Sequence, residues 1–145
     1  MYRVVRYSLK LIKDGSFKSE IKIITKARDA YELVRAMMEN LPVEYFQIIM
    51  LDVKCQVIGT SLVTIGTLNE TAISPREIFQ RALFTNSMSI ILVHNHPSGD
   101  PTPSHEDIEF TKLIMEGGKI LHITVLDHII VGDDKYISLK EDGYV

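Results

Sequence analysis

Two histidines and one aspartate have the residue types and spacing to hold a metal ion and leave one coordination position open. His94 and His96 are separated by one residue, and Asp107 follows His96 by eleven positions. A catalytic zinc ion commonly takes three protein ligands and a water molecule, whereas a structural site fills all four positions with protein atoms. The set therefore predicts a zinc ion, Zn²⁺, that takes part in chemistry.

The sequence before the histidines indicates how the two imidazoles would be placed. Residues 89–93 are apolar and rich in branched side chains, which is typical of a strand buried on both faces. Because side chains alternate along a strand, His94 and His96 would project from one side and Asn95 from the other. Both rings could then reach one ion.

The segment after the histidines predicts a stiff loop and then a helix. Residues 97–103 contain three prolines and a glycine, which excludes helix and ladder pairing there. Ser104 would cap a helix that ends at Gly117-Gly118, with Asp107 in its first turn. Ser104 and Asp107 also match a capping box, in which both side chains only satisfy backbone N–H groups.

The pattern His94-x-His96-Pro97 with Ser104-x-x-Asp107 resembles the metal-binding signature of the JAB/MPN (JAMM) metalloprotease-like domains. The string from His94 to Ser104 is similar to the RadC branch of that family, as are residues 74–83 and 126–132. The resemblance covers about residues 41–145, and residues 1–40 match less specifically. It implies an α/β fold in which helices flank a mixed β-sheet, with the layering of cytidine deaminases.

The resemblance also implies an activity and roles for single residues. The protein would be a zinc-dependent hydrolase that cleaves a peptide or isopeptide bond in a protein substrate with an extended tail. Glu44, just before a strand predicted at residues 45–53, would be the general acid/base, and Ser104 would donate a hydrogen bond to the tetrahedral oxygen. Without the family, Glu44 is an ordinary exposed residue with Asp52 and Glu70 as rivals, and Ser104 could use its hydroxyl on the helix cap alone.

Two other functions stay open. The domain could be a metal-binding protein-interaction module without turnover, or a DNA repair-associated factor, as the RadC label suggests. A zinc nucleobase deaminase needs a Pro-Cys-x-x-Cys ligand pair, and the single cysteine, Cys55, excludes it.

Length and composition predict one domain over residues 1–145. The chain has 145 residues, of which 46% are apolar, which suffices for a sizeable core. One cysteine cannot form an internal disulfide, and no apolar run is long enough to span a bilayer. We therefore expect a cytoplasmic protein without a membrane partner, and no counterpart of the helix-hairpin-helix region that precedes the domain in longer RadC-type proteins.

Charge is unevenly distributed along the chain. Residues 1–28 hold eight Lys/Arg against two Asp/Glu, although the net charge of the whole chain is −3. A basic end can contact nucleic acid. We favour instead a β-hairpin of residues 7–23 that turns at Asp14-Gly15, with the lysines on its solvent-exposed face and protecting its edge, because no aromatic stacking pattern accompanies the charges.

The remaining elements and histidines follow from periodicity. His105 should be solvated, His122 should face water or a polar seam, and Cys55 should be a turn or edge residue and not a nucleophile. His128 is either half of a pair with Asp127 near the site or a hydrogen-bonded structural histidine, and we favour the second. Helices are expected at 27–40 and 74–86, and strands at 56–64, 120–126, 129–131 and 136–138.

Overall fold

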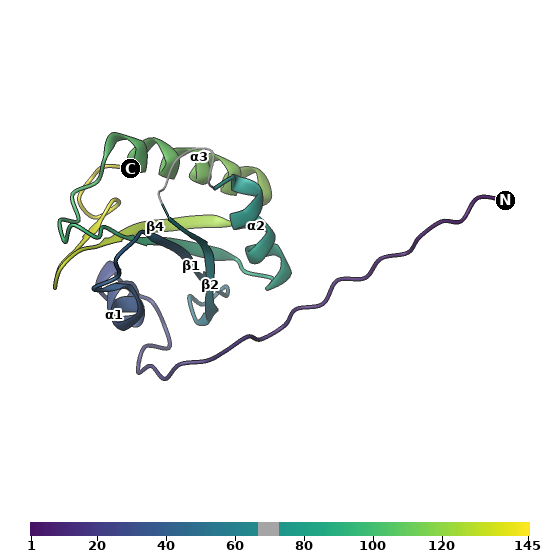
Figure 1. Cartoon of the computed structure of the whole chain (residues 1–145), viewed down its shortest axis with the longest axis horizontal. Coiled ribbons are helices and arrows are strands. Elements are labelled where there is room, and N and C mark those ends of the chain that lie inside the picture. Colours follow the sequence, from purple (N-terminus) through teal and green to yellow (C-terminus); the bar gives the residue numbers. More distant parts are fainter. Residues whose placement is uncertain (67–72) are drawn as a thin grey trace.

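Over the residues that the structure describes, the protein forms a five-stranded sheet with helices on both faces (Figure 1). The computed structural model describes residues 1–66 and 73–145. Within these residues, no helix has both the length and the apolar character that crossing a membrane requires. The elements in chain order are α1 (Ala27–Met38), β1 (Tyr45–Leu51), β2 (Val57–Ile65), α2 (Pro75–Phe84), β3 (Ser89–Asn95), α3 (His105–Leu121), β4 (Thr124–Val131) and β5 (Tyr136–Ser138).

The sheet is mixed, as predicted, with the strand order β2-β1-β3-β4-β5. The pair β3 and β4 is parallel, and the other three neighbouring pairs are antiparallel. Parallel neighbours need a crossover connection, and here α3 supplies it. The first turn of α3 therefore lies close to the end of β3, which brings two distant parts of the sequence together.

Alternation along β3 divides the core into two layers. Ile91 and Val93 pack against α1 on one face of the sheet. Ile90 and Leu92 pack against α2 and α3 on the other face. Every residue of β3 is buried, and this explains the uninterrupted apolar run in the sequence.

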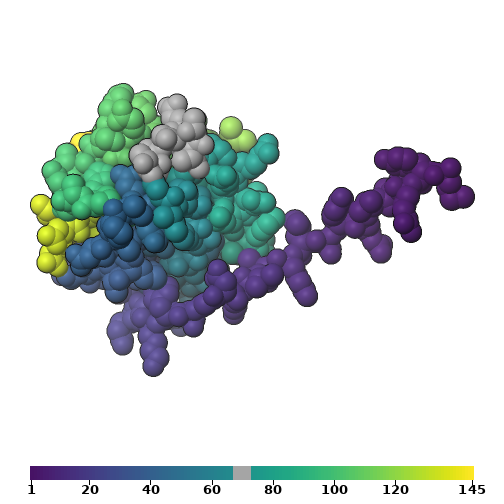
Figure 2. Space-filling model, viewed as in Figure 1, coloured from purple at the N-terminus to yellow at the C-terminus, as the bar shows by residue number. Residues whose placement is uncertain are grey.

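The prediction of an N-terminal hairpin from the alternating pattern is wrong. Residues 1–22 form no helix or strand, and Ile23 makes only an isolated bridge to Gln56 of the turn before β2. The segment extends away from the body of the molecule (Figures 1 and 2). The side chains of Tyr7 and Leu9, which would have lain on the apolar face of the hairpin, are 85% and 76% exposed. A two-stranded ribbon is marginal unless another element covers that face.

The helix α3 passes through Gly117-Gly118, where the sequence predicted its end. A side-chain carbon at Gly117 would lie 2.9 Å from the ring of Phe79 in α2, and one at Gly118 would collide with the carbonyl oxygen of Ile123. The glycines therefore allow close packing instead of ending the helix, which ends at Leu121 with His122 in the left-handed conformation. Two strands were expected, at residues 120–126 and 129–131, but the structure has a single strand there, β4. The other predicted elements agree with the structure within a few residues.

Candidate metal centre

The end of β3 carries both histidines. His94 is the penultimate residue of the strand and pairs with Phe46 of β1, and His96 is the first residue beyond it. The side chain of His94 is completely buried, whereas that of His96 is 15% exposed. The strand thus places one protected and one accessible imidazole next to each other.

Asp107 reaches the histidines from the first turn of α3. The hydroxyl oxygen of Ser104, the N-cap, accepts a hydrogen bond of 3.0 Å from the backbone N–H of Asp107. A carboxylate oxygen of Asp107 accepts one of 2.8 Å from the backbone N–H of Ser104. This is the capping box, and it coexists with the approach to the histidines because a carboxylate offers about four lone-pair sites.

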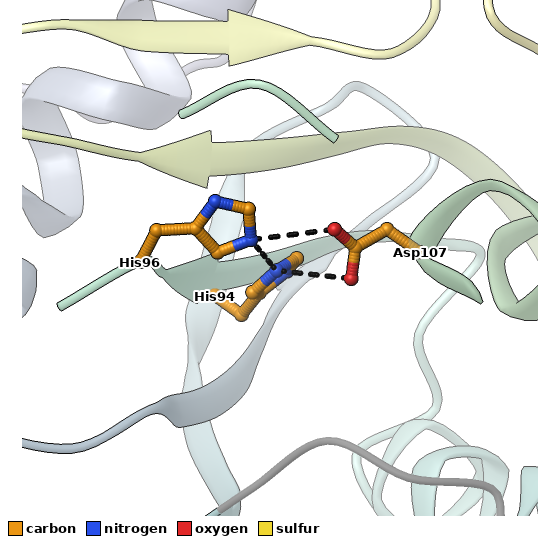
Figure 3. A group of neighbouring side chains, drawn as sticks. All are labelled: His94, His96 and Asp107. Atoms are coloured by element: carbon orange, nitrogen blue, oxygen red, sulfur yellow. Dashed lines mark hydrogen bonds and ion pairs between the residues drawn. The ribbon is translucent and has the colours of Figure 1, made fainter. Parts of the chain in front are cut away.

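The metal-binding atoms of three side chains converge at this point (Figure 3). The Nε2 atoms of His94 and His96 are 3.0 Å apart. Each of these nitrogens lies 3.3 Å from a different carboxylate oxygen of Asp107. In a tetrahedral zinc site, ligand atoms about 2.0–2.1 Å from the ion lie roughly 3.3 Å from one another. These shortest separations are close to those around one small divalent cation, and one ligand atom from each side chain lies within 4.8 Å of the others.

The carboxylate of Asp107 and the imidazole of His96 each shift the pKa of the other. Burial acts to raise the pKa of Asp107, but hydrogen bonds to His94 and His96 outweigh it and hold that pKa far below its usual value of 3.8. Burial acts to lower the pKa of His96, but hydrogen bonds to Asp107 and to the Asp100 carbonyl raise it above 6.5 overall. The cluster thus contains a negatively charged carboxylate, that of Asp107, which attracts a cation.

The loop between β3 and α3 fixes the orientation of the His96 ring. The Nδ1 atom of His96 lies 2.8 Å from the carbonyl oxygen of Asp100. The loop in turn docks on the end of β4, where the N–H of Asp133 donates to the carbonyl oxygen of Gly99. A side chain at Gly132 would collide with that same oxygen, so glycine is required there. The proline-rich composition and this close approach together fix the ring of His96.

Asn95 turns away from the histidines and binds the segment before β1. Its side-chain oxygen accepts a hydrogen bond of 2.6 Å from the N–H of Tyr45, and its side-chain nitrogen donates one of 3.0 Å to the carbonyl oxygen of Val43. These two bonds fix the backbone on both sides of Glu44. The alternation of β3 predicted the direction of Asn95, but not its partners.

Glu44 lies at the same cleft as the cluster. Its negative charge is one of the causes that raise the pKa of His96. Ser104 lies on this cleft too, beside the first turn of α3. In the described part of the chain, the cleft of about 430 Å³ is lined by Glu44, His96, Pro97, Ser98, Ser104, Glu106 and Asp107.

A fully buried histidine lies behind His94. The Nε2 atom of His128 in β4 is 2.7 Å from Nδ1 of His94, and its Nδ1 atom is 2.6 Å from the hydroxyl oxygen of Thr111 in α3. Burial, and then the neighbouring His94, lower the pKa of His128 well below its usual value. The side chain of His128 is thus hydrogen-bonded, as favoured, but not to the side chain of Asp127, whose carboxylate accepts hydrogen bonds from the hydroxyl of Ser138 and the backbone N–H of His128.

Sequence reasoning missed Thr111 and the contact between His94 and His128. A local signal existed for Thr111, because it follows Asp107 by four positions and so shares its face of the helix. For His128 the signal was not local, since its contact with His94 depends on the parallel pairing of β3 and β4.

The other residues considered for the site lie elsewhere. Asp52 follows the opposite end of β1, where its carboxylate accepts hydrogen bonds from the backbone N–H groups of Lys54 and Gln56. Glu70 lies outside the described residues. His105 and His122 are exposed, as expected. Cys55 occupies the turn before β2 with a positive φ of 57°.

Comparison with known proteins gives close relatives. Residues 24–144 match the family model described as "RadC-like JAB domain". A UPF0758 protein of Methanococcoides burtonii is 49% identical over 122 residues, which are 84% of this chain and 53% of that protein. A UPF0758 protein of Caldanaerobacter subterraneus is 50% identical over 121 residues, 83% of this chain and 52% of that protein. The chain thus spans about half the length of these relatives.

Proposed function

The chain belongs to the family of RadC-like JAB domains, and from this membership and the geometry of the cluster we propose that it is a zinc-dependent hydrolase of the JAMM type. Its substrate would be a peptide or isopeptide bond. The observation that carries the proposal is the convergence of His94, His96 and Asp107 on one point beside a cleft that also contains Glu44.

The donor set fits a cation. A carbonyl oxygen can only accept a hydrogen bond, so Nδ1 of His96 must donate to the Asp100 carbonyl, and a neutral His96 then directs the lone pair of Nε2 at the cluster. That lone pair faces Nε2 of His94 at 3.0 Å and the charged carboxylate of Asp107 at 3.3 Å. A lone pair and a carboxylate this close repel each other unless a proton or a metal cation lies between them.

A zinc ion held by these three side chains would polarise a carbonyl group and lower the pKa of a bound water molecule to about 7. The carboxylate of Glu44 would accept a proton from the attacking water. It would then return that proton to the nitrogen of the leaving amine. The two hydrogen bonds of the Asn95 side chain support this assignment, because they fix the backbone on either side of Glu44.

Ser104 would stabilise the oxygen that becomes negative during the attack. Its use as a helix cap does not exclude this role, because the cap uses the hydroxyl oxygen as an acceptor and leaves the O–H proton free to donate. Ser104 lies on the cleft beside His96 and Glu44. A substrate with an extended tail would suit the open shape of that cleft.

A cleavage assay together with metal analysis tests the proposal. Wild type, Glu44→Gln and His96→Ala would be supplied with zinc and incubated with libraries of peptides and isopeptide-linked peptides. We expect turnover by the wild type only, with one zinc per chain in wild type and Glu44→Gln and loss of zinc in His96→Ala. A Glu44→Gln protein that cleaves as fast as wild type would remove the assignment of Glu44.

The same experiment separates the hydrolase from a module that binds metal without turnover. In that case the wild type would bind zinc and cleave nothing. A role at DNA is favoured by one observation, namely that every residue of the net basic segment 1–20 is exposed. Binding of duplex DNA that weakens steeply with salt concentration would support it.

A further inference from the structure

We propose that Thr111 and His128 are positioning residues that fix which ring nitrogen of His94 is free to bind metal, an inference that rests on the metal site proposed above. Neither residue is exposed to solvent. They therefore act through His94, without touching a substrate. The proposal follows from the directions that four successive hydrogen-bonding groups must adopt.

The first direction is set at the backbone of Asp107. The hydroxyl oxygen of Thr111 lies 2.6 Å from the carbonyl oxygen of Asp107. Two oxygens can approach this closely only if a proton lies between them, and the carbonyl has none to give. The single hydroxyl proton of Thr111 is thus committed to Asp107.

The second direction follows at His128. Because the hydroxyl of Thr111 donates its proton in the hydrogen bond to Asp107, its oxygen must accept a hydrogen bond from Nδ1–H of His128, 2.6 Å away. His128 is completely buried, and burial disfavours the charged imidazolium form. A neutral ring with a proton on Nδ1 carries a lone pair on Nε2.

The third direction is that of His94. Its Nδ1 atom lies 2.7 Å from the lone pair on Nε2 of His128, so Nδ1 of His94 must carry a proton and donate it. When His94 is neutral, its own lone pair is therefore on Nε2, which is the atom that faces His96 and Asp107. The ring of Phe46 packs against both imidazoles, with centroids 6.3 Å from His94 and 5.8 Å from His128.

The chain of hydrogen bonds thus starts on the backbone of one metal ligand and ends on the ring of another. It runs from Asp107 in α3 through Thr111 and His128 to His94 in β3. Metal-binding histidines usually donate their second N–H to a carbonyl or carboxylate, and loss of that partner typically costs about 10–100-fold in metal affinity. Here a second histidine can serve as the acceptor only because Thr111 holds it in the right tautomer.

The variant Thr111→Val tests this role with almost no change of shape. Without the hydroxyl, Nδ1–H of His128 has no acceptor, and His128 gains by moving its proton to Nε2. Nδ1 of His94 must then accept, and the proton of His94 moves to Nε2, where it blocks the metal. We expect zinc affinity, measured by competition with a chelator, to fall about 10–100-fold. Thr111→Ser is the matched control, because it keeps the hydroxyl and should stay within a few-fold of wild type.

Nitrogen-15 NMR of the histidine rings in the metal-free protein reads the tautomers directly. At pH 8 we expect a proton on Nδ1 of both His94 and His128 in wild type and Thr111→Ser. In Thr111→Val we expect the proton on Nε2 of both rings. A His94 with an unprotonated Nδ1 in wild type would overturn the inference, whether or not Thr111→Val folds.

The outcomes separate this inference from the proposed function. Zinc affinity of Thr111→Val equal to that of wild type, with both proteins folded by circular dichroism, would refute the role of Thr111 and leave the metal site standing. Failure of wild type itself to bind zinc would refute the metal site, and the NMR experiment would still decide the tautomer of His94.

Discussion

At the scale of single residues, neighbours in sequence divide the work of the candidate site. His94 and His96 face Asp107, while Asn95 between them fixes the backbone around Glu44. A strand makes this possible, because successive side chains leave it on opposite sides. One tripeptide thus links the metal ligands to the proposed general base.

Removing the two hydrogen bonds of the Asn95 side chain should impair catalysis without removing the metal. In Asn95→Ala the segment around Glu44 loses both hydrogen bonds, and a displacement of a catalytic group by 1 Å can cost about 100-fold in rate. We expect kcat to fall about 10–100-fold while zinc affinity stays within a few-fold of wild type. The double variant with Glu44→Gln should be no slower than Glu44→Gln alone, since both changes act on one step. Additive losses would show that Asn95 acts elsewhere.

The coupled pKa shifts of His96 and Asp107 predict opposite pH dependences with and without metal. In the metal-free protein the raised pKa of His96 contributes stability that is complete below 6.5 and is lost as pH rises through the folded pKa. The lowered pKa of Asp107 contributes stability above 3.8 that is lost at lower pH. Zinc binding displaces the proton of His96, so the stability of the zinc form should rise with pH over the range where that of the metal-free form falls.

Urea denaturation at a series of pH values from 6.5 upward measures both slopes. His96→Gln is the control, because it removes the titrating group, and its metal-free form should lose the decline. The same decline in His96→Gln as in wild type would show that another group causes it.

Residue patterns that are local in sequence predicted the cluster better than those that are not. The pair of histidines at a strand end and the first turn of a capped helix are short patterns, and they identified His94, His96 and Asp107 as candidates. Glu44 needed the family resemblance, because its place beside the histidines depends on the pairing of β1 with β3. The spacing of four residues places Thr111 on the same helix face as Asp107, but the contact of Thr111 with His128, and of His128 with His94, depends on the packing of α3 and β4 beside β3, which no short pattern encodes.

At the scale of elements, α3 shows where sequence rules compete. A glycine often ends a helix, and Gly117-Gly118 predict an end of α3 at that position. The same residues also permit close contact, and here Phe79 and Ile123 approach the helix at those two positions. The choice between the two uses depends on the neighbouring elements, so the sequence of the helix alone could not decide it.

Alanine substitution at these glycines should therefore destabilise the protein. In an ordinary helix the change from glycine to alanine gains about 1 kcal/mol. At Gly118 the new methyl group would meet the backbone carbonyl of Ile123, and we expect a loss of about 1–3 kcal/mol in the free energy of unfolding. Gly117→Ala should lose less, because the ring of Phe79 can shift more easily than backbone.

Urea denaturation of the variants provides the measurement, with Gly59→Ala in β2 as control. A methyl group at Gly59 would have only an ordinary contact of 3.9 Å with Met50, so little change is expected there. A Gly118→Ala protein as stable as wild type would contradict the packing described for the end of α3.

At the scale of the whole molecule, the sequence predicted the α/β layers and the mixed sheet because these follow from long, regular patterns. The apolar run of β3 and the periodicity of α1 give a strand buried on both faces and a helix buried on one. The N-terminal segment was predicted wrongly for the opposite reason. Its alternation specifies how side chains would face in a strand, but forming a strand also requires an element to cover the apolar face.

The fold places the site where a parallel strand pair and its crossover helix meet. Ligands in α/β sheets commonly bind at the carboxyl ends of such strands. Here that position gives two imidazoles from β3 and a carboxylate from α3, with a hydrogen-bonded chain through β4 behind them. The central claim is therefore that three side chains from this junction bind one metal ion and leave room for a solvent molecule.

X-ray absorption at the zinc edge of the 1:1 zinc complex measures the ligands of the ion directly. The account predicts two imidazole nitrogens at about 2.0–2.1 Å, with oxygen atoms completing a four-coordinate shell, and loss of this signal in the His96→Ala and Asp107→Ala variants. A sulfur ligand, a third imidazole, or an unchanged spectrum in the Asp107→Ala variant would contradict it.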